Sequence, residues 1–413
     1  MKIKLKKIIK KLEKKLKAYL KNLKLTERKF NILELCLIII MTTVTGVLVG
    51  ELIFSNGKTY QQTKGISELE SVYNTLINDY YGELTVEELE EAAINGMMNL
   101  LNDKYSTYYD EEAAEKLNEE LDGTFIGIGA EVANDINGTP IIVTIFEDMP
   151  ADKAGLKAGD KILKLDGEDV SQMSTTDLVK KIKGTTKAVE LTVERNNEEL
   201  KIKFTTGKVD IPSVTKQIFE KENKKIGYLA IDIFALNTDE QFEKQLLELE
   251  EEKIDSLIID VRNNSGGHLD TVVNISNLFI NKGDPICRIK TKEKTTIIKS
   301  TTKTDRKYDI VVLTNQESAS ASELLTGVLK EIYGATIIGT TTYGKGTVQK
   351  TKSLTNGAMI KYTSETWLTA KGNSIEGVGI APTIEIELDD NYYSNPVAEN
   401  DNQLQKAIET LNK

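Results

Sequence analysis

The sequence has one histidine, His268, and two cysteines, Cys36 and Cys287, among its 413 residues. A zinc site of the His-Glu-x-x-His kind needs two histidines, and a disulfide framework or a cysteine-rich metal cluster needs more than two cysteines. These shortages exclude such sites and predict that the protein uses no cofactor. Hydrolytic chemistry would therefore have to come from Ser, Lys, Asp or Glu, or from the single imidazole.

Acidic residues are almost absent from residues 1–30, which contain 13 Lys and Arg but only Glu13 and Glu27. The net charge of the whole chain is nevertheless -11, so the remaining residues carry about -22. A body that acidic repels a phosphate backbone, and we expect no nucleic acid partner. Hydrophobic residues make up 39% and charged residues 28% of the chain, which is typical of globular domains.

Long hydrophobic runs are also scarce, and one stretch, from Leu35 to Phe54, is long and apolar enough to cross a membrane. We predict a basic cytoplasmic segment at residues 1–30, a single transmembrane helix at residues 31–54, and the rest of the chain outside the cell membrane. A cleaved signal peptide is less favoured, because the basic region is too long and no small-x-small site follows closely. The Lys-rich start fits an amphipathic helix on anionic lipid and a solvated charged tail equally well.

Beyond this stretch the sequence pattern changes three times. Residues 62–118 place apolar residues at helical spacing, with a capping box at Thr85 and Glu88. Residues 119–208 contain short β-rich runs between turns. Strands and helices alternate over residues 209–390, which predicts an α/β domain, and residues 391–413 are predicted to form a C-terminal tail helix. The predicted fold class is therefore multidomain, with α/β and α+β parts.

Two stretches within residues 119–208 resemble a PDZ domain. One is Ile126-Gly127-Ile128-Gly129, where glycines allow backbone N–H groups to turn toward an anion. The other is the Ala-Gly-Leu-x-x-Gly-Asp-x-Ile stretch at residues 154–162. The first stretch alone could be an ordinary turn, but the pair indicates a PDZ domain. The resemblance implies that the first stretch takes the C-terminus of a peptide by strand addition.

Three loops, each after a predicted strand, carry residues with catalytic potential. In residues 260–268 the paired glycines allow a backbone N–H to project into a cleft as an oxyanion donor, although a tight turn is the simpler interpretation. Residues 318–323 read Ser-Ala-Ser-Ala-Ser-Glu just ahead of a predicted helix, where a serine is usually an N-cap but can be a nucleophile beside the helix's positive end. Glu323 is interpreted as a residue that complements the helix dipole.

The third loop, residues 343–349, reads Tyr-Gly-Lys-Gly-Thr-Val-Gln. Its flanking glycines would let Lys345 bend into a cleft. In an extended segment Lys345, Thr347 and Gln349 would share one face, because side chains alternate with a period of two. A phosphate-binding loop is disfavoured, because the Gly-x-x-x-x-Gly-Lys-Ser/Thr spacing is missing.

In order and in rough spacing, these loops resemble those of the C-terminal processing peptidases, which are PDZ-bearing serine peptidases with a Ser/Lys dyad. The resemblance covers about residues 66–385 and implies a ClpP/crotonase-like α/β protease core, a PDZ domain that gates activity, and a possible homodimer. Two departures, Ser265 in place of a proline and Trp367 in place of a tyrosine, are not expected to touch the dyad.

Residue by residue, the resemblance implies that Ser320 is the nucleophile. Its 25-residue separation from Lys345 favours it over Ser318 and Ser322. Lys345 is then the general base and Gln349 the residue that orients it. The implied oxyanion donors are the backbone N–H groups of Gly266 and Ala321.

A serine–lysine dyad works only if the lysine is neutral, and the ordinary lysine pKa lies near 10.4. An apolar cleft must therefore lower the pKa of Lys345. The preferred hypothesis is a membrane-anchored, extracytoplasmic endopeptidase that cuts proteins near their free C-terminus. A Ser-His-Asp triad through His268, a non-catalytic PDZ membrane adaptor, and a signal-peptide-degrading Ser/Lys peptidase are the alternatives.

Overall fold

The computed structural model describes residues 59–183 and 188–413. The predicted basic segment and the predicted transmembrane helix lie outside these residues. Within the described part of the chain, no helix is long and apolar enough to cross a membrane. The chain divides into two units, Met1–Ala93 and Ile94–Lys413.

The described part of the first unit is helical. Helix α3 spans Thr59–Asp79, and α4, Val86–Asn99, begins in this unit and ends in the second. The predicted capping box forms at the start of α4: the Glu88 N–H donates to Thr85 Oγ1 at 3.1 Å and the Thr85 N–H donates to Glu88 Oε2 at 2.9 Å. Along α3 the apolar side chains of Ile66, Leu69 and Val72 are 58% to 63% exposed.

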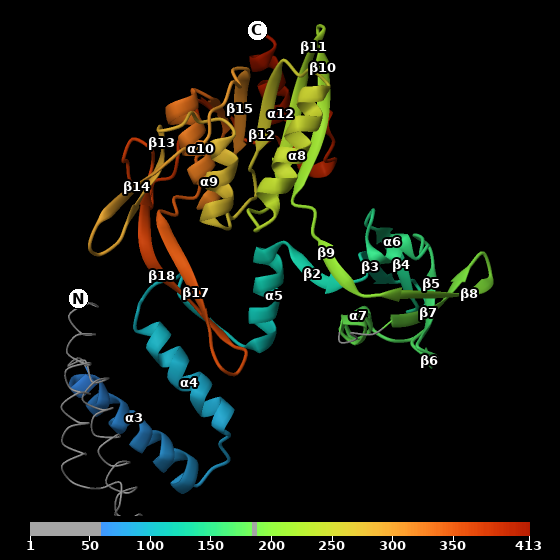
Figure 1. The fold of residues 1–413 in the computed structure, drawn as a ribbon, viewed down its shortest axis with the longest axis vertical. Coiled ribbons are helices and arrows are strands. Elements are labelled where there is room, and N and C mark those ends of the chain that lie inside the picture. The colour runs from blue at the N-terminus through green and yellow to red at the C-terminus, as the bar shows by residue number, and fades with distance from the viewer. Residues whose placement is uncertain (1–58, 184–187) are drawn as a thin grey trace, which may run out of the picture. The chain divides into compact units, whose positions relative to one another are not determined.

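The second unit continues with a short strand, a helix and a β-rich domain (Figure 1). Five strands of this domain form a sheet in the order β3-β4-β5-β7-β8, and β6 pairs with β5. Strands β2 and β9 pair separately as a two-stranded ribbon. The elements are β1 (Thr107–Tyr109), α5 (Glu111–Asp122), β2 (Thr124–Gly127), β3 (Ala130–Asn134), β4 (Pro140–Ile145), α6 (Pro150–Lys153), β5 (Lys161–Leu165), β6 (Glu168–Asp169), α7 (Thr175–Lys183), β7 (Ala188–Arg195), β8 (Glu198–Thr205) and β9 (Gly207–Asp210).

The β-rich domain has its own core, which explains the Gly-Asp-x-Ile signature. Ile162 lies fully buried among residues such as Leu178 and Leu191. Asp160 is also fully buried, and its carboxylate accepts hydrogen bonds from the Arg195 guanidinium at 2.6 Å and from the backbone of Lys157 at 2.9 Å. The polar residue of the motif is thus satisfied by an internal ion pair rather than by a ligand.

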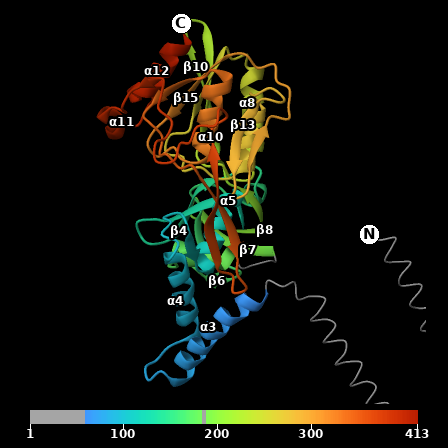
Figure 2. The same cartoon turned by 90° about the vertical axis from the view of Figure 1, so that its left-hand side faces the viewer.

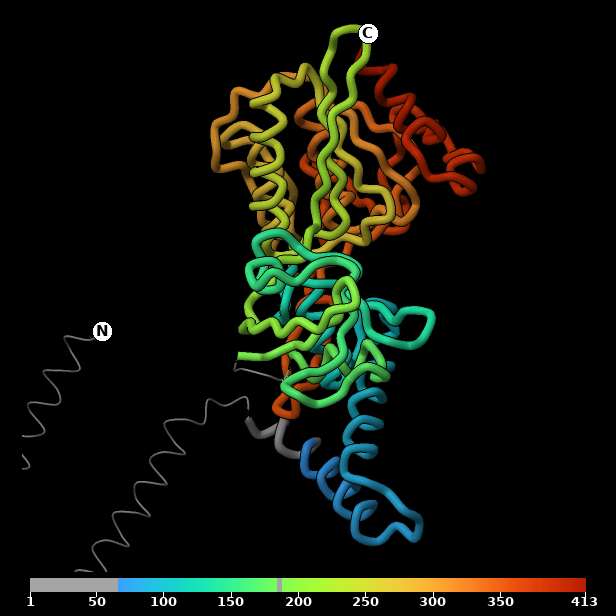
Figure 3. Tube along the Cα trace, turned by 90° about the vertical axis from the view of Figure 1, so that its right-hand side faces the viewer, coloured from blue at the N-terminus to red at the C-terminus, as the bar shows by residue number. Residues whose placement is uncertain are grey.

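The remainder of the unit is an α/β domain built on a six-stranded sheet in the order β10-β11-β12-β15-β16-β19. Strands β10 and β11 pair as an antiparallel hairpin, whose long paired path is visible in Figure 3, and the strands from β11 onward are parallel. A second sheet has the order β1-β18-β13-β14, with β17 paired to β18. The elements are β10 (Val214–Lys221), β11 (Lys224–Ile231), α8 (Thr238–Glu251), β12 (Ser256–Asp260), α9 (Leu269–Asn277), β13 (Pro285–Lys290), β14 (Thr295–Lys299), β15 (Asp309–Thr314), α10 (Ala321–Val328), the π-helix η1 (Leu329–Tyr333), β16 (Thr336–Gly339), β17 (Thr347–Ser353), β18 (Met359–Leu368), β19 (Ile384–Glu385), α11 (Asp390–Ser394), the 3₁₀ helix η2 (Ala398–Asn400) and α12 (Asn402–Leu411).

Both faces of the six-stranded sheet are covered, so its central strands are apolar throughout. On β12, Leu257 and Ile259 face a core shared with α8, α9 and α10, whereas Ile258 faces a second core shared with α12. Figure 2 shows α8 and α12 on opposite sides of the sheet. The C-terminal helix is therefore an integral layer of this domain.

The parallel strands bring the three catalytic-type loops to one edge. The loops after β12, β15 and β16 all leave the carboxyl ends of neighbouring strands. In an open parallel sheet that edge is where binding sites form.

Candidate active site

A cleft of about 600 Å³ brings together the predicted catalytic residues. Apolar side chains from α9, α10 and β18 form part of its wall, among them Val272, Leu324 and Trp367. The predicted residues that line it are Gly266, Ser320, Ala321, Lys345 and Gln349, together with the single histidine, His268. The predicted peptide-binding residues 126–129 do not line this cleft.

Ser320 occupies a strained backbone position immediately before α10. Its φ of 56° and ψ of -110° lie in a region that L-residues rarely adopt, at a cost of about 1–3 kcal/mol. The turn sets Ser320 against the glycine loop: a Cβ added to Gly266 would lie 2.9 Å from Ser320 Cβ. That position accepts only glycine, which explains the Gly-Gly sequence at this point.

The three serines of the 318–322 loop differ in the hydrogen bonds that their hydroxyls make. Ser318 Oγ donates to the carbonyl of Val261 at 2.8 Å, and Ser322 Oγ donates to the carbonyl of Asn264 at 2.8 Å. Both are buried and fasten the serine loop to the glycine loop. Within the described residues the Ser320 hydroxyl donates to no group, and it lies in the cleft. Of the three, Ser320 alone has a hydroxyl that donates to no group among the described residues, although its oxygen faces the Glu323 N–H in a capping box at the start of α10.

Glu323, interpreted from sequence as a dipole-complementing residue, has a larger structural role. Its fully buried carboxyl accepts from Thr342 Oγ1 at 2.6 Å and from the Gly344 N–H at 2.7 Å through Oε1. Through Oε2 it accepts from the Ser320 N–H at 2.8 Å and the Lys345 N–H at 2.9 Å. Four donors on two oxygens match the acceptor capacity of an ionised carboxylate. This side chain therefore ties the serine loop to the lysine loop.

Lys345 is half-buried and lies just before β17. Burial lowers the pKa of its side chain, and the positive charge of Lys361 lowers it further, against the opposing influence of Tyr343, Glu323 and Asp103. The direction is the one a lysine base requires. Its backbone carbonyl accepts from Trp367 Nε1 at 3.0 Å, so the expectation that Trp367 does not touch the dyad is wrong.

The two residues of the predicted dyad are not in contact through a hydrogen bond in the part of the chain that the structure describes. No hydrogen bond joins Ser320 Oγ to Lys345 Nζ among the described residues, and Lys345 Nζ lies instead 4.8 Å from the centre of the Tyr105 ring. Gln349 Nε2 donates to Thr347 Oγ1 at 3.0 Å and to Thr363 Oγ1 at 3.1 Å, not to the lysine.

The predicted common face of Lys345, Thr347 and Gln349 forms in part. Thr347 and Gln349 lie on one side of β17, where Gln349 Nε2 donates to Thr347 Oγ1, whereas Lys345 precedes the strand.

The predicted oxyanion donors lie close together but are not both free. A Cβ on Gly266 would be 3.1 Å from the Ala321 nitrogen, so the two residues are neighbours. The Gly266 N–H, however, donates to Asn264 Oδ1 at 2.8 Å in this structure. The prediction of two open donors is therefore corrected for this arrangement: rotation of the Asn264 side chain is needed to free one of them.

His268 lines the cleft as the N-cap of α9. Its Nε2 is buried and makes no hydrogen bond within the described residues. No hydrogen bond links it to Ser320 or to a carboxylate in that part of the chain, so the orientation required of a triad histidine is missing.

The predicted peptide-binding residues divide between two elements. Ile126 and Gly127 belong to β2, where they pair with Lys208 and Gly207 of β9. Ile128 is buried in the β-rich core, and Gly129 follows it with a φ of 76°. Only the second half of the motif lies in the loop that leads into β3.

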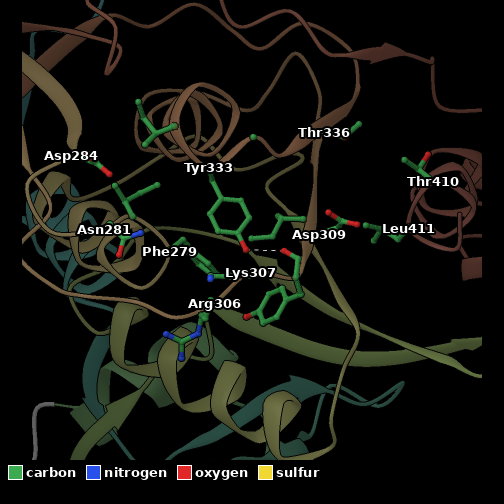
Figure 4. A pocket seen from close by; sticks show the side chains of 15 residues that line it. Phe279, Asn281, Asp284, Arg306, Lys307, Asp309, Tyr333, Thr336, Thr410 and Leu411 are labelled. Atoms are coloured by element: carbon green, nitrogen blue, oxygen red, sulfur yellow. Dashed lines mark hydrogen bonds between the residues drawn. The ribbon is translucent and has the colours of Figure 1, made fainter.

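A further cavity of about 500 Å³ lies away from these loops (Figure 4). Its wall contains Arg306, whose guanidinium binds Glu250 in a neighbouring helix, and Tyr333, whose hydroxyl donates to the Tyr308 carbonyl at 2.7 Å. Burial raises the pKa of Tyr333 to about 12. Among the residues that the structure describes, the lining contains no serine or cysteine nucleophile, and the cavity is the weaker candidate for catalysis.

Comparison with known proteins identifies the domains of the chain. Residues 225–386 match peptidase family S41, residues 117–194 match the PDZ domain, and residues 49–113 match the N-terminal domain of the activating protease CtpB. These matches confirm the helical N-terminal domain, the PDZ β-domain and the α/β protease core.

Two relatives are similar over most of their length. The chain is 38% identical over 343 residues to the carboxy-terminal processing protease CtpB of Bacillus subtilis (strain 168), covering 82% of this chain and 71% of that protein. It is 34% identical over 352 residues to a CtpA-like serine protease of Staphylococcus aureus (strain COL), covering 84% and 70%. The solved photosystem II D1 C-terminal processing protease is 24% identical, with a TM-score of 0.45 over 76% of this chain and 85% of that one. The chain therefore belongs to peptidase family S41, as a PDZ-bearing serine peptidase of the C-terminal processing group.

Proposed function

We propose that Ser320 and Lys345 form the catalytic dyad of this peptidase. Neutral Lys345 takes the proton of the Ser320 hydroxyl while Oγ attacks the scissile carbonyl, and it then returns that proton to the departing amine. A water molecule releases the acyl group by the same route. The Ala321 N–H at the start of α10, and the Gly266 N–H once freed from Asn264, stabilise the oxyanion, and Gln349 orients the lysine.

The observation that carries this proposal is the Ser320 hydroxyl, whose proton is donated to no group among the described residues, with Lys345 lining the same cleft and the Glu323 carboxyl holding both backbones. The two residues lie on loops whose backbones are held by the same buried Glu323 carboxyl, which fixes the loops relative to each other.

The PDZ domain is proposed to capture the free C-terminus of a protein substrate. In the described part of the chain, strand β3 pairs with β4 alone, which leaves its other edge for a peptide to add as a strand. The Ile128-Gly129 loop precedes that edge. Ile126 and Gly127 lie in β2, which pairs with β9. Through these two strands, peptide binding would influence the active site.

Two further parts of the proposal concern location and assembly. The apolar stretch at residues 31–54 after a basic segment supports a single-pass anchor in the cell membrane, with the peptidase on the outer side. The apolar side chains exposed along α3 support a homodimer formed by the helical region.

The test is cleavage by the full chain in detergent micelles, with model proteins that end in a free or an amidated C-terminus. We expect cleavage that prefers the free end and disappears in Ser320→Ala and in Lys345→Ala. Retention of cleavage in Ser320→Ala would contradict the dyad. Binding of tails without cleavage by the wild type would favour the non-catalytic adaptor. Protease protection in oriented membrane vesicles tests the anchor and its orientation.

A further inference from the structure

The turn at Asp103–Ser106, between α4 and β1, contacts the lysine of the cleft from more than 200 residues away in sequence. Lys345 Nζ lies 4.8 Å from the centre of the Tyr105 ring, within the range of a cation–π contact. Lys104 Nζ lies at the same distance from that ring and donates to the Tyr343 hydroxyl at 3.0 Å. The half-buried Tyr105 ring is thus in contact with two cationic side chains.

Hydrogen bonds hold this turn in place and connect it to the lysine hairpin. Ser106 Oγ donates to Asp103 Oδ2 at 2.6 Å and accepts from the Thr363 N–H of β18 at 3.1 Å. The hydroxyl of the same Thr363 accepts from Gln349 Nε2. Strand β1 then pairs with β18 from Thr107↔Lys361 onward. The turn therefore holds Tyr105 against the lysine and is joined through Thr363 to the residue proposed to orient it.

We infer that Tyr105 is a positioning residue, and this inference depends on the proposed Ser320/Lys345 dyad. The Tyr105 ring holds Lys345 in a protonated resting position away from Ser320. A cation–π contact stabilises the ammonium form and has no comparable attraction for the neutral amine. Catalysis needs the neutral amine at the Ser320 hydroxyl, so the lysine must leave the Tyr105 ring in order to act. The segment from Asp103 to Tyr109 thereby sets the balance between the resting and engaged positions.

Several charged and titratable groups act on Lys345 and must stay unchanged in the test. Asp103 and Glu323 attract the ammonium, Lys361 repels it, and Tyr343 lies near it beside Lys104. The direct variant is therefore Tyr105→Leu, which removes the ring and adds no charge. The matched variant is Tyr105→Phe, which keeps the ring and removes only the hydroxyl.

The experiment measures kcat/KM against pH for the full chain in micelles on a free-ended substrate, with the reaction of Ser320 with a fluorophosphonate probe as a second readout. Tyr105→Leu is expected to raise kcat/KM at pH 7 about two- to fivefold, which corresponds to a contact of about 0.5 to 1 kcal/mol. Tyr105→Leu should also move the acidic limb of the curve of kcat/KM against pH to lower pH. Tyr105→Phe should keep the wild-type curve. A thermal unfolding curve for each variant shows whether the protein is folded.

Three results would overturn the inference: an unchanged acid limb in folded Tyr105→Leu, an acid limb moved to higher pH, or equal changes in the Leu and Phe variants. If Tyr105→Leu does not fold, Ser106→Ala loosens the same turn and should shift the limb in the same direction, and no shift there counts against the inference. Failure of the dyad itself looks different, because Ser320→Ala would then retain activity whatever the Tyr105 variants do.

Discussion

Replacing Glu323 with glutamine tests whether its carboxyl, the hub of four hydrogen bonds that joins the serine loop to the lysine loop, positions the proposed dyad. Glutamine has nearly the same size but one acceptor oxygen instead of two. The Thr342 hydroxyl and the Gly344 N–H converge on Oε1, and the backbone N–H groups of Ser320 and Lys345 converge on Oε2. Whichever way the amide is turned, its NH₂ group faces two donors.

The size of the effect follows from those contacts. A hydrogen bond to a charged partner contributes about 1.5–3 kcal/mol, so losing two weakens the connection between the loops by about 3–6 kcal/mol. A tenfold change in rate corresponds to about 1.4 kcal/mol. If the hub acts by holding the dyad in place, kcat/KM should fall by about 10²- to 10⁴-fold in Glu323→Gln.

The assay is steady-state cleavage of a free-ended protein by the full chain, with the unfolding midpoint measured for each variant. Glu250→Gln is the matched control, since Glu250 also accepts several hydrogen bonds, from Arg306 and Tyr308, but contacts neither catalytic loop. Its kcat/KM should stay within about threefold of wild type. A folded Glu323→Gln protein with near-wild-type kcat/KM would refute the reasoning, because the hub would then not position the dyad.

Three more predictions follow from the structure. Because burial lowers the pKa of Lys345, kcat/KM should rise with pH through a single acid limb centred below about 10.4 and fall as the pH drops through it; a pH-independent profile would argue against a lysine base. His268→Asn should lower kcat less than about tenfold, since His268 makes no hydrogen bond to Ser320 among the described residues. A loss of kcat as large as that of Lys345→Ala would favour the Ser-His-Asp triad instead. Asp160→Ala leaves the Arg195 guanidinium without its buried partner and should destabilise the PDZ domain by about 3 kcal/mol. The measurement is hydrogen exchange, which should become faster in β7 and β8. The control is Lys201→Ala, which removes an exposed ion pair with Glu190 and should change the exchange rates little.

Short motifs were enough to identify the family and its PDZ and protease domains. The Gly-Gly, Ser-Ala-Ser and Gly-Lys-Gly loops, and the PDZ signature, are each contained within a few consecutive residues. Glycines and small residues there meet local backbone demands, such as the contact of Gly266 with the serine loop. Local demands of this kind are legible in a linear sequence, as is the helical spacing around the Thr85 capping box.

The state of the site, by contrast, was decided by tertiary contacts. The donors to Glu323 from Thr342, Gly344 and Lys345 lie 19 to 22 residues away, and Tyr105 meets Lys345 across 240 residues, so no local pattern could reveal either contact. Whether the Gly266 N–H is free depends on the rotation of one side chain, that of Asn264.

The sequence by itself therefore determined which family the chain belongs to and which loops are the candidates for catalysis, because those features depend on neighbours along the chain. Only the tertiary structure decided which serine hydroxyl donates to no other group, which carboxyl joins the loops, and that the lysine lies on an aromatic ring rather than at the serine. Those outcomes depend on hydrogen bonds and packing between segments that meet only when the sheet is assembled.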